Sequence, residues 1–264
     1  MGRQRMFIKN QLCESMRNWL EQIGQFMLFI GQFFRSLLRR PLDGLETLRQ
    51  THEIGSKSLL LVGVSGLSIG MVLAMQTSST LARFGGRGLL PSMIAVAVLR
   101  EIGPIITALV VSGRVGAGIA AQLGSMRVTE QIDAMEVAAL YPFGYLVRTR
   151  ILACLIALPI LTIYADFLAL MGGYVIMFFQ QNISLKLYFS SAIRFIDLQT
   201  VLPAVAKTAI FGFIIGSIAT FTGYYTRHGT RGVGQSAMIA VVLSSLFVIV
   251  ADVLLVKLTL ILFG

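Results

Sequence analysis

Arginine and glutamate stand side by side in a stretch of the sequence that is long and apolar enough to cross a membrane. The stretch covers residues 89–113, and its central letters, LREIGP, contain Arg100, Glu101 and Pro104. An ionisable side chain at the middle of a bilayer costs roughly 2.5–3.5 kcal/mol on insertion scales. Because such residues in spans mark a polar pathway or a protein interface, we expect Arg100 and Glu101 to line a cavity.

Pro104 predicts a distortion of the helix beside this pair. Proline has no N–H, so it cannot donate a hydrogen bond to the carbonyl of Arg100, four residues earlier. The helix should therefore kink and leave that carbonyl free. Arg100 and Glu101 point about 100° apart on a helix, so they are poorly placed to pair with each other. Each needs a partner from another helix, from a second copy of the chain or from water.

Three more ionisable residues, Asp166, Lys207 and Asp252, fall in apolar segments. One hypothesis is that they form buried ion pairs that fix the helix register, Lys207 with Asp166 or Asp252. A second hypothesis is an ion relay through Arg100, Glu101, Asp166 and Asp252, as in a secondary transporter or channel. A third is a membrane scaffold that transports nothing. The residue types alone leave these alternatives open.

The elements that must position these residues are membrane helices. Hydrophobic residues make up 56% of the 264 residues, charged residues only 13%, and the mean hydropathy is +0.80. A soluble domain is rarely so apolar. A span needs about 20 mostly apolar residues, and five segments qualify: 58–76, 89–113, 151–179, 201–222 and 236–263.

Residues 23–38 repeat apolar side chains at helical spacing, but the segment is short and interrupted by polar residues. This pattern predicts an interfacial helix that lies on the membrane, with a short sixth span as the alternative. Small residues predict close helix approach in the first and fourth spans, and a pair of glycines is expected to loosen the third; these residues are Gly66, Gly70, Gly212, Gly216, Gly172 and Gly173.

The basic residues are distributed unevenly along the chain, whose formal net charge is +10. With five spans, residues 1–57, 114–150 and 223–235 share one side of the membrane and hold fifteen Lys and Arg residues, whereas segments 81–88 and 180–200 hold four. Basic loops stay in the cytoplasm. This predicts a cytoplasmic amino terminus and a periplasmic carboxyl terminus, and it accounts for the charge without nucleic-acid binding.

The connection over residues 114–142 is too long for a simple turn. Thr129 is expected to cap a helix over 130–140, which Pro142 limits. Glu130, Asp133 and Glu136 recur every three residues and form an acidic stripe, and Ile132 lies on an apolar face with Met135. Such a helix can dock a partner, although an acidic stripe that is merely solvated is the alternative.

Residues that would catalyse a reaction or hold a metal are missing from the sequence. It contains no GxxxxGK[ST] phosphate loop, no HExxH and no GxSxG. Cys13 and Cys154 lie in different segments, and His52 and His228 are isolated, so neither a disulfide nor a metal site is expected. We therefore expect a transport subunit rather than an enzyme, without a cofactor of its own.

The segment over residues 99–137, LREIGPIITALVVSGRVGAGIAAQLGSMRVTEQIDAMEV, resembles the signature of the MlaE/YrbE permease family. Members of that family are the membrane subunits of ABC-type lipid transporters that work with MCE proteins. The resemblance extends from about the first span to the carboxyl terminus and is densest over 85–142. It implies a homodimer driven by two separate ATPase subunits, which bind ATP and Mg²⁺.

The resemblance also implies roles for particular residues. Arg100 and Glu101 match the charged pair near the family's central lipid cavity, with Pro104 beside them. Residues 129–137 match the coupling helix that sits in a groove of the ATPase, so the expected coupling residues are Thr129, Glu130, Gln131, Asp133, Met135 and Glu136.

The same resemblance implies partners and a location. An MCE-domain protein is expected on the periplasmic side, and some systems add a small STAS-domain protein. The usual cargo is phospholipid moved between inner and outer membranes, and the lack of a Ser-rich plastid extension favours a bacterial inner membrane. The expected fold class is an all-α integral membrane protein: an amino-terminal interfacial helix within 1–57, then a permease domain over 58–264 with five transmembrane helices and a cytoplasmic coupling helix at about 129–140.

Overall fold

The computed structural model describes residues 2–38, 43–83, 87–194, 196–227 and 229–263, and every regular element in these ranges is helical. Five helical stretches are long and apolar enough to cross a membrane, which confirms the expected all-α membrane fold. They are Gly44–Ser79, Leu90–Val128, Phe143–Gln181, Val201–Tyr224 and Gly229–Leu262. The first begins earlier than the expected start at residue 58, so the spanning helix includes part of the amino-terminal region.

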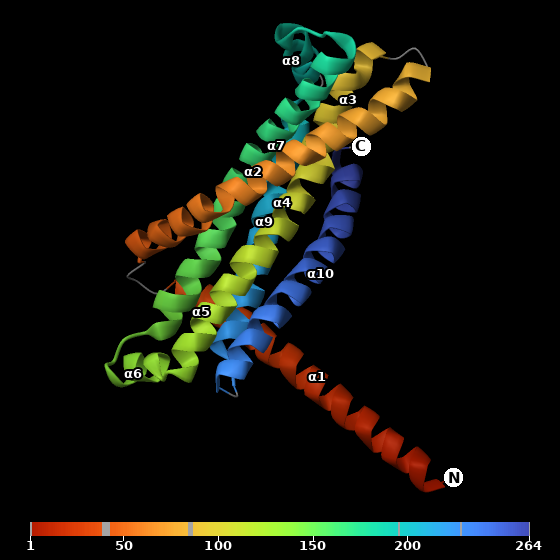
Figure 1. The fold of residues 1–264 in the computed structure, drawn as a ribbon. Coiled ribbons are helices and arrows are strands. Elements are labelled where there is room, and N and C mark those ends of the chain that lie inside the picture. The colour runs from red at the N-terminus through yellow and green to blue at the C-terminus, as the bar shows by residue number, and fades with distance from the viewer. Residues whose placement is uncertain (1, 39–42, 84–86, 195, 228, 264) are drawn as a thin grey trace.

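The five long stretches form a bundle, and α1 projects away from it (Figure 1). The short helix α6 lies at the same end of the bundle as the turn between α9 and α10, and α8 lies at the opposite end. The main helices are α1 (Gly2–Leu37), α2 (Gly44–Arg83), α3 (Leu90–Ala97), α4 (Gly103–Val111), α5 (Ala117–Val128), α6 (Gln131–Val137), α7 (Thr149–Gln181), α8 (Leu185–Ile193), α9 (Leu198–Tyr224) and α10 (Gly229–Phe263). A 3₁₀ turn, η1 (Arg87–Leu89), precedes α3.

The second span is one long helix with two π-helical turns in it. These are η2 (Val98–Ile102), between α3 and α4, and η3 (Ser112–Gly116), between α4 and α5. A third π-helical segment, η4 (Phe143–Arg148), leads into α7. The expectation of a connection over 114–142 was wrong for its first half, because the apolar residues Val115, Ile119 and Leu123 continue the helix through α5 and are buried.

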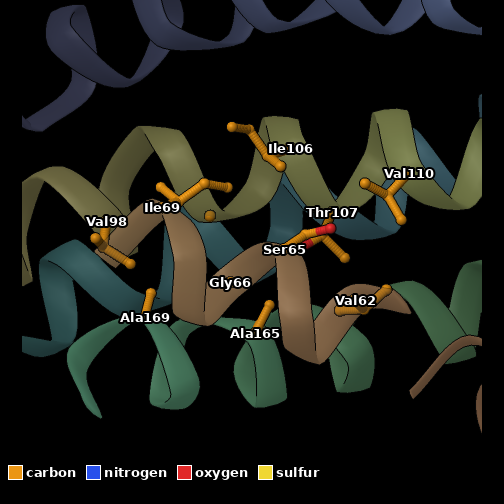
Figure 2. A pocket seen from close by; sticks show the side chains of 11 residues that line it. Val62, Ser65, Gly66, Ile69, Val98, Ile106, Thr107, Val110, Ala165 and Ala169 are labelled. Atoms are coloured by element: carbon orange, nitrogen blue, oxygen red, sulfur yellow. The ribbon is translucent and has the colours of Figure 1, made fainter. Parts of the chain in front are cut away.

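Helices α2 and α7 pack backbone against backbone along a seam of small residues. A Cβ atom on Gly66 would lie 2.5 Å from the carbonyl oxygen of Ala165, and one on Gly70 would lie 1.8 Å from that of Ala169. Figure 2 shows α2 between α4 and α7, with Ser65 and Thr107 turned into a hollow of about 10 Å³ that the three helices line. The close approach predicted for the first span is therefore confirmed.

The glycines of the third span do the opposite of what was expected. A Cβ atom on Gly172 would lie 2.2 Å from the carbonyl oxygen of Leu67, and one on Gly173 would lie 2.7 Å from the hydroxyl of Tyr188. These glycines tighten contacts with α2 and α8 rather than loosen the helix. In the fourth span Gly212 approaches the carbonyl of Cys154 in the same way, as predicted.

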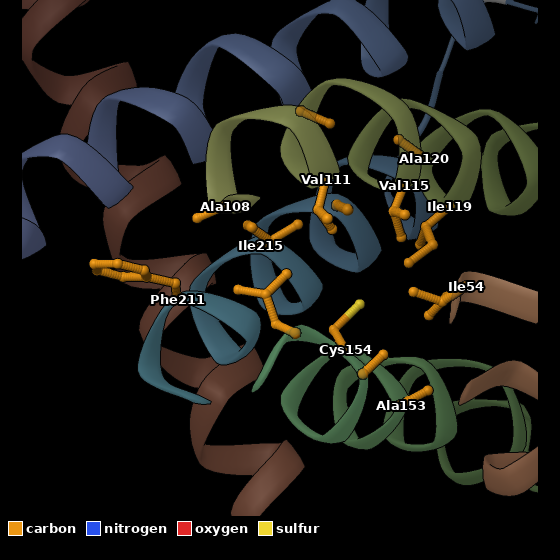
Figure 3. Packing of buried hydrophobic residues seen from close by; sticks show 14 of the residues in the cluster. Ile54, Ala108, Val111, Val115, Ile119, Ala120, Ala153, Cys154, Phe211 and Ile215 are labelled. Carbon is orange, nitrogen blue, oxygen red and sulfur yellow. The ribbon is translucent and has the colours of Figure 1, made fainter. Parts of the chain in front are cut away.

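The main hydrophobic core lies between the second span, α7 and α9. Val111 and Val115 meet Cys154 of α7 and Ile215 of α9 there, and all four are buried (Figure 3). These side chains are small or branched, so the helices come close and hold their neighbours in a fixed register. The ionisable residues of the spans are positioned by this core.

Helix α1 is longer than the expected segment 23–38, and its second half packs on the bundle through aromatic rings. Phe29 and Phe33 are buried, and Phe29 lies 5.1 Å from Phe143 and 5.4 Å from Phe221 between ring centroids. The buried Arg148 donates a hydrogen bond to the Ser36 carbonyl at 2.9 Å. The apolar side chains on the other side of α1, such as Met27, stay exposed, as an interfacial helix would leave them.

Candidate functional site

The distortion predicted at Pro104 is present, and another helix uses it. In η2 the N–H of Gly103 bonds to the carbonyl of Val98, five residues earlier, and Pro104 is the second residue of α4. The carbonyl of Arg100, which Pro104 cannot reach with a donor, accepts a hydrogen bond from Nζ of Lys207 at 3.3 Å. A lysine on α9 thus fills the opening that the proline creates in the second span.

Lys207 also joins two carboxylates from different helices. Its Nζ lies 2.7 Å from Oδ1 of Asp252 on α10 and 3.9 Å from Oε1 of Glu101 in η2. The side chains of Lys207 and Asp252 are 4% and 9% exposed, whereas that of Glu101 is 41% exposed. We call Lys207, Asp252 and Glu101 the lysine cluster. A buried ion pair of this kind is costly to break, because removing one partner leaves a bare charge.

Arg100 differs from its neighbour Glu101. Its side chain is exposed, and among the described residues no ion pair or hydrogen bond involves its guanidinium. Its carbonyl is held by Lys207, so the backbone is fixed while the side chain stays exposed. Pro104 is buried and shapes the backbone rather than the surface. The second span therefore presents one unpaired cation and one half-buried carboxylate at bundle depth.

Asp166 does not join the lysine cluster. It is buried on α7, and its Oδ1 atom has no hydrogen-bond partner among the described residues. Of the two ion pairs considered from the sequence, only Lys207 with Asp252 is present. A relay that runs through Arg100, Glu101, Asp166 and Asp252 finds no continuous set of contacts within this described chain.

The connection between the second and third spans contains a shorter helix than expected. Thr129 does not cap α6: it ends α5, and its hydroxyl donates to the carbonyl of Ser125 at 2.9 Å. Glu130 precedes α6 in the left-handed region with φ of 59°, and its side chain caps nothing. The chain thus turns sharply between α5 and α6, and the helix ends at Val137 rather than at residue 140.

The predicted acidic stripe is divided between two kinds of contact. Asp133 forms an ion pair with Arg127 of α5, and Glu136 accepts a hydrogen bond from the hydroxyl of Tyr224 on α9 at 3.5 Å. Glu130 and Gln131 are exposed. The stripe therefore braces α6 on two spans at one side and leaves the start of the helix open.

The predicted apolar face of α6 is confirmed as its anchor. Ile132 is fully buried, and Met135 is half-buried against the same core. Two apolar side chains beyond the predicted set face outward at this end of the bundle: Val137 is 90% exposed and Leu140 is 57% exposed. A helix of seven residues is too short for its buried and exposed apolar positions to be assigned from the sequence.

Sequence reasoning also missed Tyr224 and Arg127, which tie α6 to the spans. Arg127 stands in the last turn of α5 and Tyr224 at the end of α9, where a polar or amphipathic residue is common and carries no specific signal. Only the fold brings them to Glu136 and Asp133. For metals, no group of three or more His, Cys, Asp or Glu side chains comes together within the described ranges; His228 lies outside them.

Comparison with known proteins gives a consistent family. The model of the family described as Permease MlaE matches residues 47–258. A probable ABC transporter permease protein of Rickettsia typhi is 34% identical over 95% of this chain and 97% of its own length. An intermembrane phospholipid transport system permease protein, MlaE of Haemophilus influenzae, is 31% identical over 90% of each chain. The chloroplastic protein TRIGALACTOSYLDIACYLGLYCEROL 1 of Arabidopsis thaliana is 32% identical over 85% of this chain and 64% of its own length.

Proposed function

Because this chain belongs to the MlaE permease family, we propose that it is the membrane subunit of an ABC-type transporter that moves phospholipid between the inner and outer membranes of a bacterium. The Haemophilus relative carries phospholipid transport in its name, and the alignments with it and with the Rickettsia typhi relative cover 90% and 95% of this chain. The five spans make the chain a multi-pass membrane protein. The proposal assigns transport to the spans and energy supply to another protein.

The observation that carries the proposal is the exposed Arg100 beside the half-buried Glu101, both inside a helical stretch that is long and apolar enough to cross a membrane. An exposed cation in hydrocarbon is costly, so it needs water, a second protein or an anionic group. Two copies of the chain that face each other would enclose these residues in a shared cavity. A phosphate headgroup would then pair with Arg100, since guanidinium binds phosphate through two parallel hydrogen bonds.

The lysine cluster holds the backbone of the second span where it would line this cavity. Lys207 holds the Arg100 carbonyl and two carboxylates at once, so the position of the second span depends on α9 and α10. A movement of either helix would shift Arg100. We therefore assign Lys207 and Asp252 to positioning, and Arg100 and Glu101 to contact with the headgroup.

ATP would act through a partner, because the sequence has no phosphate-binding loop. The partner ATPase, with ATP and Mg²⁺, would dock on α6, where Glu130, Gln131, Val137 and Leu140 are exposed. Exposed apolar side chains at the end of a bundle, outside the apolar spans, favour a protein interface. The two braces, Asp133 with Arg127 and Glu136 with Tyr224, would pass a displacement of α6 to α5 and α9.

The remaining partners are proposed from the family, and the orientation in the membrane is proposed from the charge pattern. An MCE-domain protein would meet the end of the bundle that carries α8, and a STAS-domain protein would bind the ATPase. The uneven basic residues favour a cytoplasmic amino terminus and a periplasmic carboxyl terminus in the inner membrane. The amino-terminal region 1–57 and the domain 58–264 stay our prediction for the division of the chain.

Reconstitution of the purified complex tests the proposal. The complex, with its copurifying ATPase, is placed in liposomes that contain fluorescent phosphatidylglycerol, and acceptor vesicles or a purified MCE-domain partner collect the lipid. We expect transfer that needs ATP, that stops when the ATPase is inactive, and that falls at least tenfold in Arg100→Ala. Transfer that continues on an ion gradient without ATP would instead support the ion-coupled transporter.

A charge-reversal variant tests the docking surface separately. Glu130→Lys combined with Glu136→Lys should leave the protein inserted but reduce copurification of the ATPase at least tenfold. Lys186→Glu, at an exposed position of α8 at the opposite end of the bundle, is the matched control and should not change this copurification. Equal ATPase recovery from the double variant and the wild type would contradict docking on α6.

A further inference from the structure

A crevice lies at the edge of the bundle, between α1 and the segment that joins α6 to η4. Its volume is about 470 Å³, and small-molecule sites have volumes of about 300–1,000 Å³. Five residues of α1 and one tyrosine line it: Met27, Leu28, Gly31, Gln32, Arg35 and Tyr141. The lining shares no residue with the lysine cluster and does not include Arg100.

The crevice lies where an apolar span ends. Tyr141 stands two residues before Phe143, the first residue of the third membrane-spanning stretch. Helix α1 runs at a large angle to the bundle (Figure 1), and it is attached there through the buried Phe29 and Phe33. A helix with this placement and with exposed apolar side chains lies in the plane of the membrane, at the level of the lipid headgroups.

The lining changes from apolar to polar along α1. At one end Met27 and Leu28 are 67% and 76% exposed, and at the other end Gln32 and Arg35 are exposed as well. Met27 and Arg35 are eight residues apart, so about 12 Å of helix separates the apolar end from the cation. The crevice therefore offers one molecule both an apolar surface and accessible hydrogen-bond donors.

The charge of the lining selects an anion. It contains one guanidinium and no carboxylate, and among the described residues no carboxylate forms an ion pair with Arg35. A guanidinium binds phosphate through two parallel hydrogen bonds, and the amide of Gln32 adds further donors. A headgroup that carries an ammonium finds no carboxylate to pair with here. The lining therefore favours a phosphate diester whose headgroup has no positive charge.

Two glycines shape the wall and the floor of the crevice. A Cβ atom on Gly144 would lie 2.6 Å from ring carbon Cδ1 of Tyr141, so this ring is packed closely against the start of the third span. Tyrosine is enriched where a membrane meets water, because its ring is apolar and its hydroxyl is polar. At Gly31, in the middle of the lining, a Cβ atom would meet nothing within 4 Å. The floor is thus open to a bound molecule.

We infer that this crevice binds an anionic phospholipid, whose phosphate accepts hydrogen bonds from Arg35 and Gln32 while an acyl chain lies along the apolar end of the lining. The bound headgroup would join α1 to the segment that carries α6, because both line the crevice. This lipid is separate from the transported one, since Arg100 is not part of the lining. The inference needs only a chain that spans the membrane and does not rest on the proposed transport.

Photolabelling with a matched pair of probes tests this inference on the full complex in phosphatidylcholine nanodiscs. The probes are phosphatidylglycerol and phosphatidylcholine that carry the same diazirine in one acyl chain. We expect phosphatidylglycerol to label α1 peptides at about tenfold lower mole fraction, as one hydrogen bond to a charged group predicts. Equal labelling by both probes, or a partner protein crosslinked to α1 in place of lipid, would overturn the inference. Loss of the label in excess inorganic phosphate would also overturn it, because the site would then bind phosphate without its lipid.

Two pairs of variants locate the labelling. Gly31→Trp fills the crevice and should abolish labelling of α1 by phosphatidylglycerol, whereas Gly24→Trp adds the same side chain to the same helix outside the lining and should preserve it. Arg35→Gln should bring phosphatidylglycerol down to the level of phosphatidylcholine. Arg231→Gln removes an exposed cation of α10 outside the lining and should not change the preference. A preference that persists in Gly31→Trp, or that falls equally in Arg35→Gln and Arg231→Gln, would overturn the inference.

Arg100→Ala separates this site from the proposed transport cavity. We expect it to keep the labelling of α1 by phosphatidylglycerol while lipid transfer falls. Labelling of α1 that disappears together with transfer would overturn a separate site. Transfer that persists in Arg100→Ala, with α1 still labelled, would count against the proposed transport role of Arg100 and leave the crevice at α1 supported.

Discussion

Helices α7 and α10 are both long apolar spans, but they relate to the rest of the chain in different ways. In the most apolar stretch of α7, 50% of the residues are buried inside this chain, compared with 22% in α10. Apart from Gly232 near its start, the buried residues of α10 form one stripe at every fourth position, at Ala240, Ser244, Val248 and Asp252. Helix α7 is therefore the centre of the protomer, whereas α10 is attached along a narrow line and has a broad face for lipid or a second copy.

This difference shows which helix is packed fully within the chain and which helix leaves a face for other molecules. The contacts of α7 are backbone contacts through small residues, which fix a distance and cannot adjust. The contacts of α10 include a hydroxyl cluster, in which Ser112 lies 2.7 Å from Ser244 and 3.0 Å from Ser245, and the ion pair of Asp252 with Lys207. Helix α10 is therefore held by a few polar contacts along a narrow line, whereas α7 is held by a continuous backbone seam.

The largest effect is expected where α7 meets α2. Gly70→Leu would place a side chain 1.8 Å from the backbone oxygen of Ala169 at its first carbon, so the two helices cannot keep their distance. We expect little or no folded protein in detergent, measured by size-exclusion profile and thermal unfolding. Gly118→Leu adds the same side chain where nothing lies within 4 Å and should fold normally. A normally folded Gly70→Leu would show that the seam is adjustable.

The next effect concerns the ion pair between α9 and α10. Asp252→Leu leaves Lys207 buried with only the distant Glu101 to balance it, and we expect a loss of about 3–5 kcal/mol in the free energy of unfolding. The double variant Asp252→Leu with Lys207→Met should recover most of this loss, because both charges are then absent. Steric trapping or denaturant unfolding in bicelles measures both. A double variant no more stable than the single one would mean that packing, rather than charge, decides the loss.

A smaller effect on stability, but a specific one on assembly, is expected on the outer face of α10. Leu246→Trp and Val253→Trp change exposed side chains, so the free energy of unfolding should stay within about 0.5 kcal/mol of the wild type. Self-association, measured by energy transfer between labelled chains in liposomes, should weaken severalfold if this face meets the second copy. Ile160→Trp, exposed on α7, is the control. Unchanged association in both α10 variants would place this face against lipid.

The smallest effect is expected at the brace between α6 and α9. Tyr224→Phe removes only the hydroxyl that donates to Glu136 at 3.5 Å, so it should cost less than about 1 kcal/mol of stability. If the brace transmits movement, ATP hydrolysis should continue while lipid transfer per ATP falls two- to threefold. Tyr225→Phe, on the neighbouring residue, is the matched control. Equal lipid transfer per ATP in the wild type and Tyr224→Phe would show that the hydrogen bond between Tyr224 and Glu136 does not transmit the movement.

The sequence predicted what depends on composition and on single residues. The five spans follow from apolar length, and the open carbonyl at Arg100 follows from the missing N–H of Pro104. The partner of that carbonyl did not follow, because Lys207 is 107 residues away in the chain and several donors were available. The failure at Thr129 has a different cause: its hydroxyl serves equally well at the end of one helix and the beginning of the next, and buried residues of α5 decided between them.

The glycines show the same limit of prediction from the sequence. Gly66 and Gly172 have identical local chemistry, and only the neighbour that each one meets tells whether it weakens its helix or draws two helices together. The sequence allows Asp166 to pair with Lys207, since both lie in spans, but the fold packs its Oδ1 atom against Gly103 and pairs Lys207 with Asp252 instead. Residue type predicts that a polar group needs a partner, and three-dimensional packing determines which one it obtains.

The π-helical turn η2 makes the second span one residue longer than a regular helix that joins the same two ends would be. Shortening the chain by a single residue there would let ordinary turns form, with the flanking segments still facing the neighbours they face now. The bundle would survive such a deletion, and Pro104 would still leave a carbonyl without its helical donor, but the register between that carbonyl and the amine from α9 would change. Length variation at this one position thus changes the place where Lys207 binds the second span while it keeps the architecture of the bundle, which side-chain replacement cannot do.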